Sequence, residues 1–125
     1  MSSPIDNILN ALKEQVLNLL NDLMEIFPEE TDIMLTRLFF ETQADPQLIM
    51  DGFIKWVYPW KEQILASNEE FFEKSERIFG PIPADKVTRF KKMWKDNLLS
   101  EDDKKIVWSY FNVYIKCIER YKKYV

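Results

Sequence analysis

Residues 3–27 read SPIDNILNALKEQVLNLLNDLMEIF, and this stretch decides the fold class. Ser3 can cap a helix, Pro4 suits the first helical position, and Asp6 is an acid in the positive first turn. Apolar side chains then recur at alternating spacings of four and three residues, at Ile5, Leu9, Leu12, Val16, Leu19, Leu23 and Ile26. This period predicts an amphipathic helix that ends at Pro28.

The apolar stripe of residues 3–27 leaves two interpretations of how the helix is buried. It satisfies a strict heptad for about three repeats, which would suit a coiled coil and self-association through this helix. Ile8, Leu20 and Phe27 widen the stripe beyond the seam that a two-helix dimer needs. Packing inside a single-chain bundle is therefore favoured, and self-association as a homodimer is the second interpretation.

Helical signals recur through the rest of the chain. Caps, prolines and apolar periods predict further helices over 29–43, 45–57, 59–66, 69–79, 84–98 and 100–123. In the first of these, Ile33, Met34, Leu38 and Phe39 form the apolar stripe. In the second, Gly52 lowers helix propensity by about 1 kcal/mol relative to alanine, which indicates a close helix contact made for packing. These patterns predict a compact all-α bundle of about six helices in one domain, residues 1–125.

Composition excludes several kinds of function. The 125 residues include no histidine, so Ser–His triads and histidine zinc sites are impossible. The chain has two glycines, Gly52 and Gly80, so it contains neither a glycine-rich phosphate loop nor a dinucleotide-binding fingerprint. The acidic run Glu69, Glu70, Glu73 and Glu76 lacks the spacing of a calcium loop. We expect no enzyme, no cofactor and no metal, although an enzyme that uses carboxylates alone stays open.

The single cysteine indicates a reducing compartment. Cys117 has no partner for an internal disulfide and lies among apolar residues, so we expect it to be buried and inert. No apolar run approaches the roughly 18 residues of a membrane span. We therefore expect an intracellular protein, in the cytoplasm or nucleus, that does not enter a membrane.

The net charge of −4 hides a division along the chain. Residues 1–76 carry 15 acidic and 5 basic side chains, whereas residues 77–125 carry 6 acidic and 12 basic ones, which gives −10 and +6. A Gly-Pro-Ile-Pro loop at 80–83 separates the acidic half, 1–79, from the basic half, 84–125. The halves could present two oppositely charged surfaces, or fold against each other and complement.

The basic half raises nucleic acid as an alternative partner. Its candidate phosphate contacts are Lys86, Arg89, Lys91, Lys92, Lys95, Lys122 and Lys123. The acidic charge of the whole chain weighs against this function. A protein partner is the favoured interpretation, because 18 aromatic residues can exceed what one small core buries. The candidate interface is Phe53, Trp56, Val57, Tyr58 and Trp60, with a place in the core as the competing interpretation.

Two parts of the chain carry a family resemblance. The first runs from Asp45-Pro46-Gln47-Leu48-Ile49 through Phe53 and Tyr58-Pro59 to Glu70-Phe71-Phe72, and the second is LLSEDDKKIVWSYF, residues 98–111. Together they resemble short helical proteins encoded by large nucleocytoplasmic DNA viruses. The resemblance implies a helical fold and a viral origin, in an infected cell or a virion. It brings no catalytic motif, and the partner that it suggests is a host or virion protein.

Overall fold

The structure is a computed structural model that describes residues 3–82 and 84–125, except for the side chains of Ala84 and Lys86. Every regular element in these ranges is helical, which confirms the predicted all-α bundle of about six helices, and the seven α-helices correspond to the first predicted helix and the six further ranges. They are α1 (Pro4–Ile26), α2 (Thr31–Thr42), α3 (Pro46–Trp56), a 3₁₀ turn η1 (Tyr58–Trp60), α4 (Lys61–Leu65), α5 (Glu70–Lys74), α6 (Ala84–Lys95) and α7 (Glu101–Lys122).

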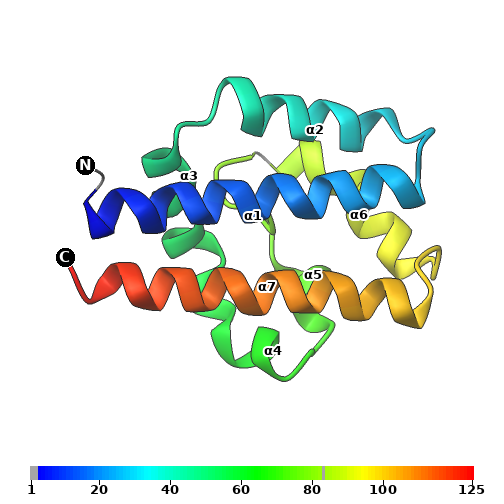
Figure 1. The fold of residues 1–125 in the computed structure, drawn as a ribbon. Coiled ribbons are helices and arrows are strands. Elements are labelled where there is room, and N and C mark those ends of the chain that lie inside the picture. The colour runs from blue at the N-terminus through cyan, green and yellow to red at the C-terminus, as the bar shows by residue number, and fades with distance from the viewer. Residues whose placement is uncertain (1–2, 83) are drawn as a thin grey trace.

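The two long helices, α1 and α7, form the frame of the bundle. They lie side by side and antiparallel, so that the N- and C-terminal ends meet at one end of the molecule (Figure 1). Ser3 caps α1 as the sequence predicts, because its hydroxyl accepts from the Asp6 amide at 3.0 Å. The apolar stripe of α1 packs on α2, α3 and α7. The coiled-coil face is thus occupied within the chain.

An aromatic cluster fills the core between α5, α6 and α7. At its centre, the Phe72 ring contacts the rings of Phe90, Trp94, Trp108 and Phe111. All five side chains are buried. The core therefore buries many of the aromatic side chains whose number suggested that they can exceed its capacity.

The acidic and basic halves fold against each other. Ion pairs that join them are Arg89–Glu30, Lys104–Glu69 and Lys61–Glu119. Lys104 is buried, and its ammonium also donates to the Asn97 side chain at 3.2 Å. The first two pairs join an acid of the acidic half to a cation of the basic half and support the interpretation in which the halves complement each other, whereas Lys61–Glu119 joins them with the charges reversed.

Two helices end earlier than their patterns predict. α5 ends at Lys74 instead of near Phe79, because Ile78 and Phe79 leave the helix to enter the core. The carbonyl of Ser75 then accepts from the Lys91 ammonium at 2.6 Å. α6 ends at Lys95 instead of Leu98, since Asn97 adopts a φ of 58°. Its turn is a Schellman motif, with the Leu98 amide donating to the Met93 carbonyl at 3.0 Å.

The loop at 80–82 lies directly on α3. A Cβ atom at Gly52 would lie 2.6 Å from the Pro81 nitrogen, so Gly52 makes a close contact as predicted, but with this loop and not with another helix. Gly80 has a φ of 67°, which favours glycine. Ile82 is buried and anchors the far end of the loop, and Pro83 lies outside the described residues.

Candidate functional site

The aromatic segment of α3 and η1 was the interface expected from the sequence. Phe53 and Val57 are fully buried, so the core interpretation holds for both. Trp56, Tyr58 and Trp60 are half-buried, and Tyr58 and Trp60 pack against the core. The segment therefore does not form one continuous apolar surface.

The half-buried rings of this segment are approached by cations of the chain itself. Lys55 and Arg77 lie 5.2 and 5.0 Å from the Trp56 ring, and Lys61 and Lys122 lie 5.9 and 4.3 Å from the Tyr58 ring. The Tyr58 hydroxyl donates to Glu119 at 3.3 Å. The hydrogen bond between Lys61 and Glu119 lowers the pKa of the Glu119 carboxyl and raises the pKa of the Lys61 ammonium. This network is polar and already paired.

Two of the candidate nucleic-acid contacts are engaged inside the protein. Arg89 forms a bidentate pair with Glu30, at 3.0 Å from Nε to Oε2 and 2.6 Å from Nη2 to Oε1. Their hydrogen bonds lower the pKa of the Glu30 carboxyl and raise that of the Arg89 guanidinium. Lys91 donates to the Ser75 carbonyl. Glu30 neutralises Arg89, whereas Lys91 keeps its charge and is held by the Ser75 carbonyl at the edge of the groove between α5 and α6.

The remaining candidate lysines do not share one surface. Lys92 and Lys95 line an open groove of about 830 Å³ between α5 and α6, together with the acids Glu73, Glu76 and Asp96. Lys122 and Lys123 lie at the other end of α7, whose 22 residues span about 33 Å (Figure 1). The Lys86 side chain lies outside the described part of the structure.

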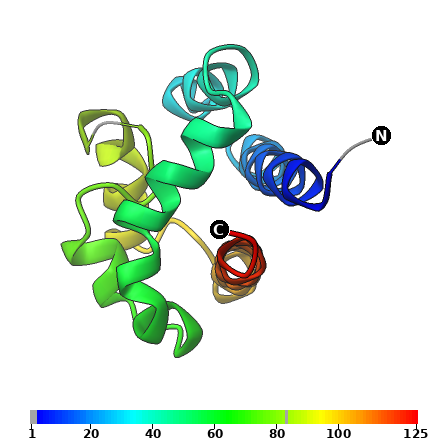
Figure 2. The same ribbon diagram turned by 90° about the vertical axis from the view of Figure 1, so that its left-hand side faces the viewer.

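The outer face of α2 carries the clearest unpartnered apolar surface. Met34, Leu35 and Leu38 are 47%, 58% and 51% exposed. α2 buries Ile33 and Phe40 instead, on the side that packs against α1 and α6. Figures 1 and 2 both show α2 at the edge of the bundle. We call Met34, Leu35 and Leu38 the α2 face.

One border of the α2 face is polar and internally paired. Arg37 forms an ion pair with Glu41 one turn later and also donates to the Asn21 side chain of α1. This border ties α2 to α1. The apolar surface therefore opens toward the opposite side of α2.

On that opposite side, a groove separates α2 from Ile82 and the first turn of α6. Its volume is about 520 Å³, and the residues that line it are Asp32, Leu35, Thr36, Phe39, Gln43, Ile82 and Asp85. Leu35 belongs to both the groove and the α2 face, so the two form one surface. Among the described residues, neither the Asp32 nor the Asp85 carboxylate has an ion-pair partner. We call this surface the α2 groove.

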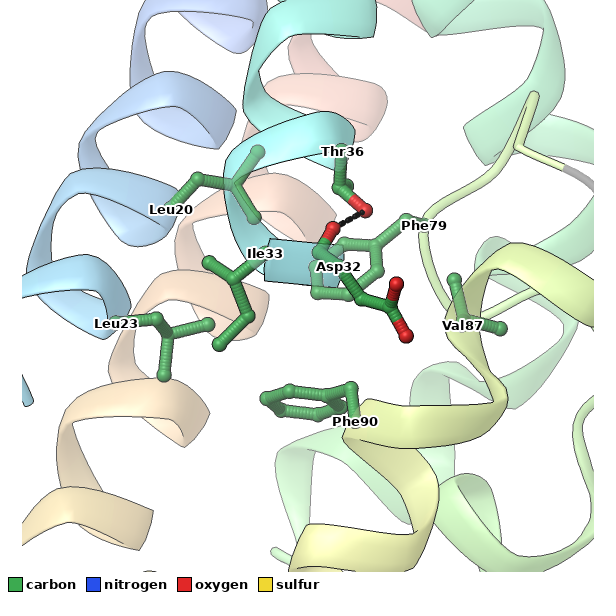
Figure 3. Close-up of a pocket in the computed structure, with 8 residues that line it drawn as sticks. All are labelled: Leu20, Leu23, Asp32, Ile33, Thr36, Phe79, Val87 and Phe90. Carbon is green, nitrogen blue, oxygen red and sulfur yellow. Dashed lines mark hydrogen bonds between the residues drawn. The ribbon is translucent and has the colours of Figure 1, made fainter. Parts of the chain in front are cut away.

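A small pocket adjoins the α2 groove and shares Asp32 and Thr36 with it (Figure 3). The Thr36 hydroxyl donates to the Asp32 carbonyl at 2.8 Å, and the Asp32 carboxylate lies on the side of α2 that faces Val87. The pocket measures about 10 Å³, close to the space that one water molecule needs. It is too small for a ligand, so the useful surface is the open groove outside it.

The α2 face was missed at the sequence level because Met34 and Leu38 were assigned to the apolar stripe of residues 29–43. That assignment is wrong for both side chains, which point away from the core. Apolar residues in α2 cover more of the helix than one buried stripe, at 33, 34, 35, 38, 39 and 40. This wide distribution was the available signal for a second apolar side.

No similarity to a known protein indicates the function of this chain. The chain matches no protein-family model, no curated protein and no solved structure. Within the described residues, no helix has the length and apolar character to cross a membrane. In the same residues, no group of three or more His, Cys, Asp or Glu side chains could hold a metal ion. Cys117 is buried as predicted, and burial raises the pKa of its thiol.

Proposed function

We propose that the protein is a non-enzymatic interaction module that docks another protein on the α2 face and its groove. The observation that carries this proposal is the cluster of Met34, Leu35 and Leu38, each about half exposed on one side of one helix. The other large exposed apolar side chains lie singly on other elements or at the end of the chain: Leu48, Leu65, Leu98, Ile106, Tyr124 and Val125. Contiguous apolar surface beside a groove is typical of a docking site, whereas single exposed side chains are ordinary.

The resemblance to proteins of large nucleocytoplasmic DNA viruses suggests the setting of this function. In that setting the partner is a host or virion protein. Self-association through α2 is the second form of the proposal. A stable interface with any protein buries about 800 Å² on each partner, more than the 12 residues of α2 supply alone, so either partner must also contact the groove beside α2.

Nucleic-acid binding is not the function that we propose for the basic half. Arg89 and Lys91 are engaged with Glu30 and Ser75, and the exposed Lys92 and Lys95 share their groove with three acids. A compact cationic surface is the main requirement for phosphate binding. The engaged and scattered cations of this chain argue against such a surface.

Differential capture tests the proposed function. The tagged wild-type chain, the double variant Leu35→Lys/Leu38→Lys and the control Leu65→Lys are used as baits in lysate of the cells that make the protein. Leu65 is 47% exposed on α4, so it matches the two α2 positions in exposure. We expect a set of proteins that the wild type and Leu65→Lys retain and that the double variant loses by tenfold or more.

The folded state of each bait is checked by circular dichroism and thermal unfolding. All three substituted side chains are about half exposed, so the variants should unfold close to the wild type. If quantitative mass spectrometry finds no protein that depends on Leu35 and Leu38, the α2 face is not the docking surface.

A further inference from the structure

We infer that the partner segment is a basic amphipathic helix that lies along the α2 groove. This inference rests on the proposed function, since it names the chemistry of what the same surface takes. Its argument has three parts: the shape of the groove, its unpaired charge, and the arrangement of that charge against a second copy of the chain.

The shape of the α2 groove suits an apolar helix face. Leu35 and Phe39 of α2 form one wall, and Ile82 lies across from them. Met34 and Leu38 extend the apolar surface over the outer side of α2. A helix in a groove presents apolar anchors at spacings of three and four residues, and α2 offers its own apolar residues at 34, 35 and 38.

The charge of the groove selects a cationic partner. Asp32 lies on the α2 side and Asp85 on the α6 side, and both are exposed. The arginines on the adjoining elements are already paired, Arg37 with Glu41 and Arg89 with Glu30. The Asp32 carboxylate also acts electrostatically on Arg89, but among the described side chains neither Asp32 nor Asp85 forms an ion pair, and both line the groove.

Both carboxylates also lie in the first turn of their helices. There each one offsets the helix dipole, which accounts for the residue type at each position separately. It does not account for their convergence on one apolar groove. A lysine or arginine at each edge of a docked helix would pair with them and fix its orientation.

The same charges disfavour a second copy docked through α2. A symmetric dimer would place equivalent surfaces against each other, so the four carboxylates of two grooves would meet. Like charges across an interface weaken association. A partner with cationic edges avoids this repulsion.

Two designed peptides of 16 residues test the inference. Both carry the same leucine stripe at spacings of three and four, with lysine on the polar face of one and glutamate on the polar face of the other. Binding to the full chain is measured by fluorescence anisotropy at low salt and at 0.5 M NaCl. We expect the lysine peptide to bind about tenfold more tightly at low salt, with a smaller ratio at high salt.

Matched variants assign the preference to the groove. Asp32→Asn/Asp85→Asn should weaken the lysine peptide about fivefold or more and remove most of the preference. The control Glu73→Gln/Glu76→Gln removes two acids from the α5–α6 groove and should change nothing. Thermal unfolding checks each variant, and Asp85→Asn alone serves if the double variant does not fold.

The outcomes separate this inference from the proposed function. Equal binding of both peptides that still requires Leu35 and Leu38 would overturn the basic partner and leave the docking surface standing. Binding of neither peptide also overturns the inference, and the capture experiment then decides on the docking surface. A rise in mass with concentration that Leu35→Lys abolishes would identify a second copy as the occupant instead.

Discussion

At the scale of single residues, two glycines let the loop at 80–82 lie against α3. A Cβ atom at Gly80 would overlap the Phe53 ring, and its φ of 67° is unfavourable for other residues. A Cβ atom at Gly52 would meet the Pro81 nitrogen at 2.6 Å, with a helical backbone that alanine accepts. The sequence predicted a close contact at Gly52 but not its partner, because nothing local to α3 encodes a loop 28 residues later.

These two contacts predict unequal costs for the same substitution. Gly80→Ala combines overpacking with a strained backbone and should destabilise the fold by about 3 kcal/mol. Gly52→Ala also crowds the loop at 80–82, but alanine favours the helix, so the free energy of unfolding should fall by only about 1 kcal/mol. Urea unfolding of both variants measures the difference. A Gly52→Ala variant that loses as much as Gly80→Ala would contradict the role of the backbone at Gly80.

At the scale of elements, the capped helix starts were predictable, and the ends of α5 and α6 were not. The start of α7 follows its capping signal: the Asp103 amide donates to the Ser100 hydroxyl at 3.1 Å, and the Ser100 amide donates to the Asp103 carboxylate at 3.4 Å. Such caps use neighbouring residues alone. The end of α5 depends on Lys91, 16 residues after Ser75, which no local pattern contains.

The exposed face of α2 was hidden from the sequence for a similar reason. Periodicity shows which residues share a side of a helix, but the number of neighbours decides which sides are covered. α2 packs on α1 and α6 and lies at the edge of the bundle, so its third apolar side stays open. A sequence gives no count of such neighbours.

The capping box of α7 predicts a specific loss of stability. Ser100→Ala removes the hydroxyl that accepts from Asp103 and should cost about 1 kcal/mol. Ser109→Ala is the control within the same helix, because its exposed hydroxyl donates only to the Lys105 carbonyl four residues earlier. That variant should stay within about 0.5 kcal/mol of the wild type. Equal losses in urea unfolding would show that the cap contributes nothing special.

At the scale of the whole molecule, the α1–α7 interface joins distant parts of the chain through tyrosines. The Tyr110 hydroxyl donates to Asp22 at 2.6 Å, and the Tyr114 hydroxyl donates to the Gln15 carbonyl at 3.2 Å. Burial, then the bond to Asp22, raises the pKa of Tyr110 to about 12. Burial also raises the pKa of Tyr114. The sequence predicts the apolar stripes of both helices, but it does not predict that Asp22 and Gln15 are the hydrogen-bond partners of these tyrosines.

The raised pKa of Tyr110 predicts how stability changes in alkali. Its pKa lies above the ordinary value of 10, so its contribution is present below pH 10 and is lost as the pH rises toward 12. Tyr110→Phe should therefore lose less stability than the wild type between pH 9 and pH 11. Urea midpoints at both values measure this, with Tyr124→Phe as the control at an exposed position. An unchanged pH dependence in Tyr110→Phe would contradict the assignment.

The pairing of the first helix with the last has a consequence for synthesis. Gln15 and Tyr114 are 99 residues apart, so a ribosome that adds about 5 to 20 residues per second takes about 5 to 20 s to make the segment between them. During that interval the side of α1 that α7 later covers has no permanent partner. A chaperone that binds exposed leucine and valine therefore has its longest opportunity on α1, and that opportunity closes when α7 emerges.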